Sequence, residues 1–359
     1  MTLQDIAEQR LYNQRLHGAT FTDPHEAVQQ LGAVQAQEFS MAKWALGMRT
    51  KGTVDANIQQ AFDSGSILRV HVMRPTWHFI AAEDIVWMQA LTGPRVHAFN
   101  AYYYRKAGLT DTLAATCKEI LAQALEGGKQ LTRTELAAVL TNKGVSSDIP
   151  LLLPYILIYA ELDGLICSGP MHGKQHTYML VRDRAPQAKP MPHDEALALL
   201  VRRYFTTRGP AQIKDFVWWS GLTVSEAKRG LDLSKHYLQS DKIEGTTYWF
   251  AADMQPYRLP GEPVFLLPSY DEFGIAYKDR SAFLQNNFSY LFVTKEGKGF
   301  FNTLLFGSQF GGSWRRTVGA KRIVVETLTS KPFTKAQERS LRQALREYEA
   351  FCQLPVTLL

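Results

Sequence analysis

Two glutamines, Gln35 and Gln37, stand two residues apart in the stretch VQAQEF at 34–39. A glutamine side chain does not titrate and is no nucleophile, so the chemistry open to the pair is narrow. Two side-chain carbonyls can hold a water molecule in place, and their dipoles can stabilise positive charge that develops beside them. The alternative is that both are ordinary polar side chains on the protein surface.

The backbone shape decides between these two interpretations. Residues i and i+2 lie about 200° apart on a helix, whereas in an extended segment they share one face. Asp23 with Pro24 and Glu26 is a helix-start signal, and Gly32 is a suitable stop. The functional interpretation therefore predicts that the helix ends between Leu31 and Val34. The alternative continues the helix through Ala42.

A second group of candidate residues lies in ILRVHVM and TWHFIA, which are typical of two strands joined near Arg74-Pro75. Alternation along paired strands places Arg69 and His71 on one face, and His78 with them if the register allows. Arg74 at the tip suits contact with a phosphate. Thr76 belongs to the same strand. A satisfied hydrogen bond in the core is the alternative for His78.

Two further segments carry candidate residues. GGSWRR at 311–316 would be a glycine turn that presents Trp314, Arg315 and Arg316 to a groove, or the closure of a barrel with two exposed charges. Asp271-Glu272 is an acidic pair in an otherwise apolar stretch, expected in a strand. Neighbouring strand residues face opposite ways, so a joint carboxylate site is poorly supported and an ion pair with an arginine is the alternative.

Composition bounds the class of protein. The chain has 359 residues, of which 45% are hydrophobic and 21% charged, as in multi-domain globular proteins. The net charge of +6 favours a polyanionic partner. Three dispersed cysteines and nine scattered histidines without ligand spacing predict neither a disulfide framework nor a metal, and we expect no cofactor. Without an apolar membrane span or signal core, we expect a cytoplasmic protein.

The fold class that the sequence predicts is α+β. Three segments repeat the order helix, second helix, two strands around a turn, which is typical of winged helix-turn-helix units. The capping boxes Thr132–Glu135 and Thr223–Glu226 open helices in the second and third units, and Gly209-Pro210 is expected to start another. The helix expected at Glu83–Lys106 bridges the first two units.

After about residue 260 short alternating strands predominate, which predicts a small antiparallel barrel or sandwich. The expected strands include VFLLPSYDEF, YLFVTKEGKGF, FNTLLFGSQFGGSWRRTVG and KRIVVETL. KAQERSLRQALREYEAFCQL is an amphipathic helix with Leu341, Ala344, Leu345 and Tyr348 on one stripe. The predicted domains are 1–108 with the bridging helix, 109–190, 191–258, and 259–359.

Five stretches together resemble the winged-helix DNA-binding family of AlkZ- and YcaQ-like alkyl-DNA glycosylases, over nearly the whole chain. They are VQAQ, RVHVMRPTWHF, RRYFTTRGPAQIKDFVWWSGLT, LLPSYDEFGIAYKDR and GGSWRR. The resemblance implies three tandem winged helices with a β-barrel around DNA. It also implies that Gln35 and Gln37 occupy the catalytic glutamine–aliphatic–glutamine motif.

The resemblance further implies hydrolysis of the N-glycosidic bond of alkylated or crosslinked purines. A cationic N7-alkylpurine leaves as a neutral base, so a positioned water and a stabilised sugar cation suffice. We expect a monofunctional, monomeric enzyme acting on damaged double-stranded DNA. The residues expected to contact DNA are Arg69, His71, Arg74, Thr76, His78, Tyr270, Asp271, Trp314, Arg315 and Arg316.

Two other functions stay open at this point. A non-catalytic winged-helix regulator or damage sensor would need a base-reading helix, but PLLLPYILIYAEL is nearly all apolar. A hydrolase of small substrates would use Asp271 or Glu272 and would not bind DNA.

Overall fold

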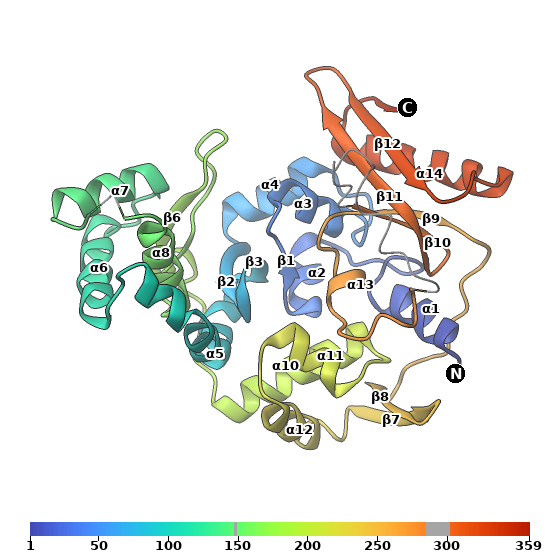
Figure 1. The fold of residues 1–359 in the computed structure, drawn as a ribbon, viewed down its shortest axis with the longest axis horizontal. Coiled ribbons are helices and arrows are strands. Elements are labelled where there is room, and N and C mark those ends of the chain that lie inside the picture. The colour runs from blue at the N-terminus through green and yellow to red at the C-terminus, as the bar shows by residue number, and fades with distance from the viewer. Residues whose placement is uncertain (147–148, 285–301) are drawn as a thin grey trace.

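The computed structural model describes residues 1–146, 149–284 and 302–359, and it is an α+β structure (Figure 1). The N-terminal part holds Gln35 within a three-stranded antiparallel sheet of order β1-β3-β2. Its elements are α1 (Leu3–Asn13), α2 (Pro24–Leu31), β1 (Val34–Gln35), α3 (Phe39–Gly47), α4 (Asp55–Ser64), β2 (Ile67–Val72) and β3 (Arg74–Ala81).

The second segment forms a compact group at one end of the molecule (Figure 1). Thr132 and Glu135 cap α7 reciprocally as predicted, and the two predicted strands form a sheet of order β4-β6-β5. The elements are η1 (Ala82–Asp84), α5 (Ile85–Lys106), α6 (Asp111–Ala124), β4 (Leu131–Thr132), α7 (Arg133–Asn142), α8 (Leu152–Leu162), β5 (Ile166–Ser168), β6 (Thr177–Leu180) and α9 (Val181–Arg184).

The third segment contains α10 (His193–Arg208), α11 (Ile213–Ser220), α12 (Val224–Leu233), β7 (Leu238–Ile243) and β8 (Thr246–Ala251). The capping box of Thr223 and Glu226 is present at the start of α12. The prediction that Pro210 opens a helix is wrong, because α11 begins at Ile213 behind a cap formed by Gln212 and Asp215.

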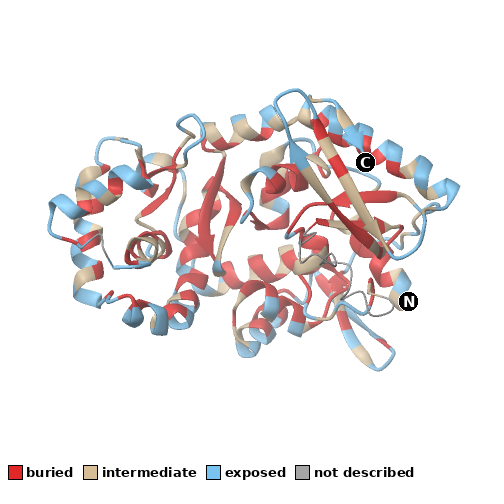
Figure 2. Ribbon diagram, turned by 45° about the horizontal axis from the view of Figure 1, so that its top comes forward, coloured by how far each residue is buried: buried red, intermediate tan, exposed pale blue. Residues whose placement is uncertain are grey.

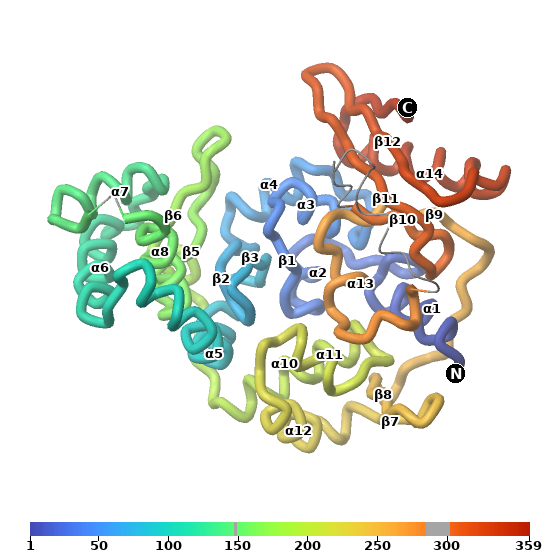
Figure 3. Tube along the Cα trace, in the orientation of Figure 1, coloured from blue at the N-terminus to red at the C-terminus, as the bar shows by residue number. Residues whose placement is uncertain are grey.

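The C-terminal segment is a five-stranded sheet of order β13-β12-β11-β10-β9 with one long helix against it (Figure 3). Its edge strand β13 runs parallel to β12, so the sheet is not wholly antiparallel. The predicted strand YLFVTKEGKGF lies outside the described residues. The elements are β9 (Val264–Leu267), α13 (Glu272–Ile275), β10 (Asn302–Phe306), β11 (Gln309–Val318), β12 (Ile323–Thr329), α14 (Lys335–Cys352) and β13 (Val356–Leu358).

Buried side chains run through the centre of the molecule and tie distant segments together (Figure 2). One core joins α1 and the β2–β3 hairpin to α10, α11 and the Phe273–Phe283 region. Another joins α2–α4 to the C-terminal sheet and to α14, whose Leu341, Ala344, Leu345 and Tyr348 are buried as predicted. The β1–β3 segment is therefore packed on both faces by chain that comes much later in the sequence.

Candidate active site

The backbone around Gln35 is extended, as the functional interpretation requires. Helix α2 ends at Leu31, and Gly32 follows with a φ of 76° that favours glycine. Val34 and Gln35 then pair with β3, where Gln35 lies opposite His78. The continuous helix through Ala42 is therefore wrong.

Gln37 lies differently from Gln35. The chain bends at Gln37, and α3 begins two residues later at Phe39. The Gln37 side chain is exposed, whereas Gln35 is only 6% exposed. The backbone carbonyl of Gln37 accepts a 3.4 Å hydrogen bond from Arg69, and Arg69 Nε donates to the Ala36 carbonyl at 2.9 Å. That the two glutamine side chains face one ligand stays a prediction.

A buried ion pair fixes the backbone of Gln35. Glu272 Oε1 accepts a 2.9 Å hydrogen bond from the Gln35 backbone N–H. The other oxygen of Glu272 accepts from Arg208 Nη2 at 2.7 Å and from Trp219 Nε1 at 2.9 Å. Arg208 also donates to the carbonyls of Leu31 and Ala33. Because Arg208 and Glu272 are both 0% exposed, this clamp holds the turn from α2 into β1 rigidly.

The side chain of Gln35 opens into a cavity of about 460 Å³. Arg74 Nη2 donates to Gln35 Oε1 at 2.9 Å, which leaves the Gln35 amide nitrogen free of protein partners among the described residues. The lining includes three arginines and three aromatic residues, and no described lining residue is acidic. The lining residues are Gln35, Met73, Arg74, Pro75, Thr76, Arg95, Val96, Phe99, Trp218, Gly221, Tyr270, Ile275 and Arg280.

Aromatic rings at this cavity are exposed to an unusual degree. Phe99 is 64% exposed, Trp218 45% and Tyr270 44%. Large apolar side chains gathered at one concave place indicate a binding surface. Arg74 is half-buried there, and burial lowers the pKa of its guanidinium, whereas Arg280 is an exposed residue of the lining. Positive charge beside exposed rings matches a nucleotide, which offers a phosphate and a flat base.

Two lining residues have left-handed backbones, although neither is glycine. Met73 has a φ of 63° and Tyr270 a φ of 60°. Such conformations cost of order 1–3 kcal/mol and gather at binding and catalytic sites. Gly221 packs against this turn, because a Cβ there would lie 2.5 Å from the Met73 carbonyl oxygen. The tip of the β2–β3 hairpin is thus held in a fixed shape beside Gln35.

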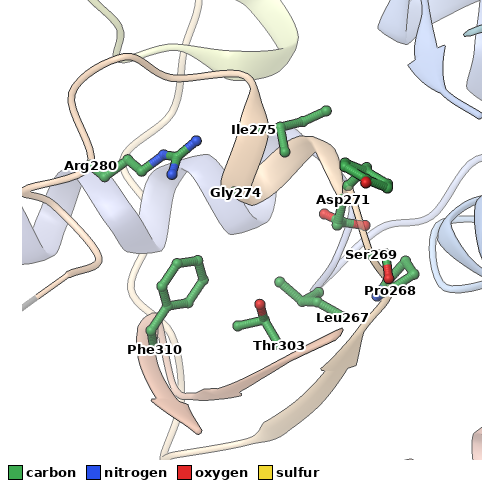
Figure 4. A pocket seen from close by; sticks show the side chains of 10 residues that line it. Leu267, Pro268, Ser269, Asp271, Gly274, Ile275, Arg280, Thr303 and Phe310 are labelled. Atoms are coloured by element: carbon green, nitrogen blue, oxygen red, sulfur yellow. The ribbon is translucent and has the colours of Figure 1, made fainter. Parts of the chain in front are cut away.

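A smaller cavity of about 190 Å³ adjoins the first and shares Tyr270, Ile275 and Arg280 with it. Figure 4 shows its side chains, which come from β9, the loop between β9 and α13, α13 itself, the loop after α13, β10 and β11. Asp271 lines this smaller cavity and is only 4% exposed. Both its oxygens accept from Arg49 at 2.8 Å, which is the ion pair given above as the alternative.

The structure corrects the predicted setting of the acidic pair. Asp271 is the N-cap of the short helix α13 and Glu272 is its first residue, so the pair does not lie in a strand. Both carboxylates are buried against arginines, which excludes free carboxylate chemistry at either. Sequence reasoning noticed the pair but missed that Glu272, with Arg208, positions Gln35; the signal was the pair's apolar surroundings.

The face predicted for the β2–β3 strands is correct for Arg69 and His71 but wrong for His78. Arg69 and His71 lie opposite Phe79 and Trp77, whereas His78 lies opposite Val70 on the other face. The Arg69 guanidinium carbon lies 4.1 Å from the centroid of the Trp77 ring, and His71 is paired with the buried Glu161. With 7% and 5% exposure, Arg69 and His71 offer little surface to DNA.

The prediction that His78 contacts DNA is wrong for its side chain in this structure, because His78 is 0% exposed. Its Nδ1 lies 2.9 Å from the Thr76 carbonyl, in keeping with the alternative of a hydrogen bond in the core. Burial first, and then the positive charge of Arg74, hold the pKa of His78 well below its usual value. The imidazole is therefore neutral.

The glycine turn predicted in GGSWRR is absent, because residues 309–318 form the single strand β11. Trp314 is 0% exposed and donates to the Leu267 carbonyl at 2.8 Å, so it is a core residue that cannot contact DNA. Arg315 pairs with Glu326 across the β11–β12 ladder. Arg316 binds Tyr348 and Ser40. Arg315 thus links β11 to β12, and Arg316 links β11 to α14 and α3.

Two further observations concern the described residues as a whole. None of their helices combines the length and apolar character needed to cross a bilayer. Nor do they contain a cluster of three or more His, Cys, Asp or Glu side chains arranged to hold a metal ion.

Comparison with known proteins shows the family to which the chain belongs. Residues 28–351 match the family described as DNA glycosylase AlkZ-like, and the chain belongs to that family. A curated relative is an interstrand DNA cross-link repair glycosylase from Streptomyces sahachiroi, 26% identical over 219 residues. That alignment spans 59% of this chain and 59% of the relative's length.

A solved structure has the same fold. The Streptomyces sahachiroi DNA glycosylase AlkZ superimposes with a TM-score of 0.79 over 100% of both chains, at 19% sequence identity.

Proposed function

We propose that this protein is a DNA repair glycosylase that hydrolyses the N-glycosidic bond of alkylated or crosslinked purines. One observation supports the proposal: Gln35, which by resemblance falls in the glutamine–aliphatic–glutamine motif, has its side chain at a cavity whose lining includes arginine and aromatic residues. The crosslink-repair name of the Streptomyces relative supports the same substrate class.

The arrangement suits a substrate that carries its own positive charge. Cleavage would leave a cationic sugar and a neutral purine, so strong acid catalysis at the leaving base is unnecessary. The Gln35 carbonyl dipole would stabilise the sugar cation and orient a water toward it. Arg74, which holds that carbonyl, would also bind the phosphate beside the lesion.

Gln37 is the second proposed glutamine, on the family resemblance alone. Its exposed position suits it to approach bound DNA from outside the cavity. The partner would be damaged double-stranded DNA, contacted through Arg74, Thr76 and Tyr270 at the cavity. We propose that a monomer acts on DNA in the cytoplasm.

The finer architecture is also proposed. The segments 1–108, 109–190 and 191–258 would be three winged helix-turn-helix units, and 259–359 a barrel with its C-terminal helix. The helix pairs followed by hairpins support this division. A regulator that reads bases with α8 has little support, because Ile156, Leu157, Ala160 and Leu162 of that helix are buried.

The test is a base-release assay on duplexes that carry N7-methylguanine or an interstrand crosslink. We expect release by the wild type and a loss of about 100-fold in Gln35→Ala, as for removal of one preorganised dipole. The DNA dissociation constant should stay within about threefold, since phosphate contacts dominate affinity. Gln30→Ala, on the outer side of α2, is the control. Unchanged release in a Gln35→Ala/Gln37→Ala double variant would refute the proposal.

A further inference from the structure

The strand β3 carries three polar residues at alternate positions, Arg74, Thr76 and His78, and its ladder with β2 is irregular between Trp77 and Arg74. Gln35 shares a face with His78, because the two residues lie opposite each other in the antiparallel ladder, and Arg74 Nη2 donates to Gln35 Oε1 at 2.9 Å. Arg74, Thr76 and Gln35 also line the large cavity. The strand therefore runs as a polar row from the cavity into the core.

Each of the three side chains has a buried polar atom that no protein group of the described residues satisfies. These atoms are Arg74 Nε, Thr76 Oγ1 and His78 Nε2. Such atoms are rare in folded proteins, because an unmatched buried donor or acceptor costs about 1–3 kcal/mol. Three of them lie on one strand, and two belong to residues beside Gln35, so they point to a small polar ligand that all three would bind.

The protonation of His78 fixes what that ligand must do. A carbonyl oxygen only accepts, so Nδ1 carries the proton that is donated to Thr76 at 2.9 Å. Because the imidazole is neutral, Nε2 is a bare acceptor. A ligand between these atoms must donate to Nε2, exchange a hydrogen bond with the Thr76 hydroxyl and accept from Arg74. Water meets all three requirements.

We propose that His78 and Thr76 hold the nucleophilic water of the reaction beside Gln35, and that His78 Nε2 receives its proton. This inference rests on the proposed glycosylase function and supplies the base that glutamine cannot provide. Thr76 acts as a positioning residue, since it orients the water without taking part in proton transfer.

The step balances without a cofactor. The C1′–N9 bond breaks, and its electron pair leaves with the purine, which turns from a cationic into a neutral base. The water oxygen then forms a bond to C1′, and one of its protons moves to His78 Nε2. The imidazolium returns that proton to solvent. The protonated sugar hydroxyl is a very strong acid, so even a weakly basic imidazole accepts its proton.

The test compares Thr76→Val, which removes only the hydroxyl, with Thr76→Ser, which keeps it. Single-turnover release of N7-methylguanine from a duplex should fall about tenfold in Thr76→Val and stay within about threefold in Thr76→Ser. His78→Leu should fall about 100-fold, the usual contribution of a general base. DNA affinity should stay within about threefold in each variant.

A second readout separates positioning from packing. With methanol added, the sugar product partitions between the hydrolysed sugar and its methyl glycoside. A held water excludes methanol, so the methyl glycoside fraction should be low in the wild type and in Thr76→Ser, and higher in Thr76→Val. The inference is overturned if Thr76→Val keeps both the wild-type rate and the wild-type fraction of methyl glycoside. It is also overturned if Thr76→Val and Thr76→Ser lose rate equally while the fraction of methyl glycoside stays that of the wild type.

The two proposals fail in different ways. If the wild type releases no base from methylated or crosslinked duplexes, the glycosylase function and this inference both fall. If Gln35→Ala is inactive while Thr76→Val and His78→Leu behave as the wild type, only the water site falls.

Discussion

The charge on Glu272 is the feature whose removal has the clearest expected consequence. In Glu272→Gln the shape is kept, but an amide cannot accept on both sides as the carboxylate does. Its oxygen should stay with the cation Arg208, which turns the NH2 group toward the Gln35 N–H. Two donors then face each other, and Gln35 loses its anchor.

The magnitude follows from burial. Breaking a fully buried ion pair by neutralising one partner costs about 3–5 kcal/mol. Arg208 keeps its hydrogen bonds to the Leu31 and Ala33 carbonyls, so we expect the lower end, about 3 kcal/mol. That is a factor of about 150 in the folding equilibrium constant. Base release should fall as well, because the position of Gln35 is no longer fixed.

Urea unfolding measures the first effect and single-turnover base release the second. The control is Asp194→Asn, which neutralises the exposed pair between Asp194 and Arg229; solvent screens such a pair, so we expect no measurable change. Equal urea midpoints for Glu272→Gln and Asp194→Asn would refute the reasoning, and would mean that Arg208 is satisfied by backbone carbonyls alone.

Three other predictions concern the cavity and the core. Phe99→Ala and Trp218→Ala should weaken DNA binding by about 1–3 kcal/mol each, because a stacked base is lost, and fluorescence anisotropy would show it; equal affinities would mean that neither ring meets a base. Arg74→Ala and Arg280→Ala should each reduce the slope of log affinity against log salt by about 1, if each binds one phosphate; an unchanged slope would contradict that role. Burial lowers the pKa of His176 to about 4, below its unfolded value of about 6.5. The folded state thus favours the neutral form, so this contribution to stability is complete above pH 6.5 and is lost as the pH falls toward 4. In His176→Leu the urea midpoint should vary less over that interval, and an undiminished variation would assign the effect to other groups.

Local signals predicted the elements well. The capping residues Thr132, Thr223 and Asp23 begin helices where expected, because an N-cap acts on its own first turn and needs no distant partner. Gly32 likewise ends α2 and frees the glutamine segment to pair with β3. The spacing of the glutamines therefore gave a correct geometric test for Gln35 before any tertiary contact was known.

The contacts around the candidate site could not be predicted from local sequence signals. The burial of Trp314 and the pairing of Asp271 with Arg49 depend on contacts between residues far apart in the sequence. The GGSWRR stretch looked like a turn because glycines are ambiguous, yet close packing explains Gly312, whose Cβ would lie 2.5 Å from the Leu328 carbonyl. Pattern alone cannot separate a glycine that bends the chain from one that lets another chain segment approach.

The hydrogen bond between Gln35 and Glu272 spans 237 residues of sequence. During synthesis at about 5–20 residues per second, roughly 12–50 s would pass between the two residues leaving the ribosome. Over that interval Gln35 exists without the carboxylate that holds its backbone N–H. The backbone at Gln35 therefore gains its anchor only after Glu272 has been synthesised, late in the production of the chain.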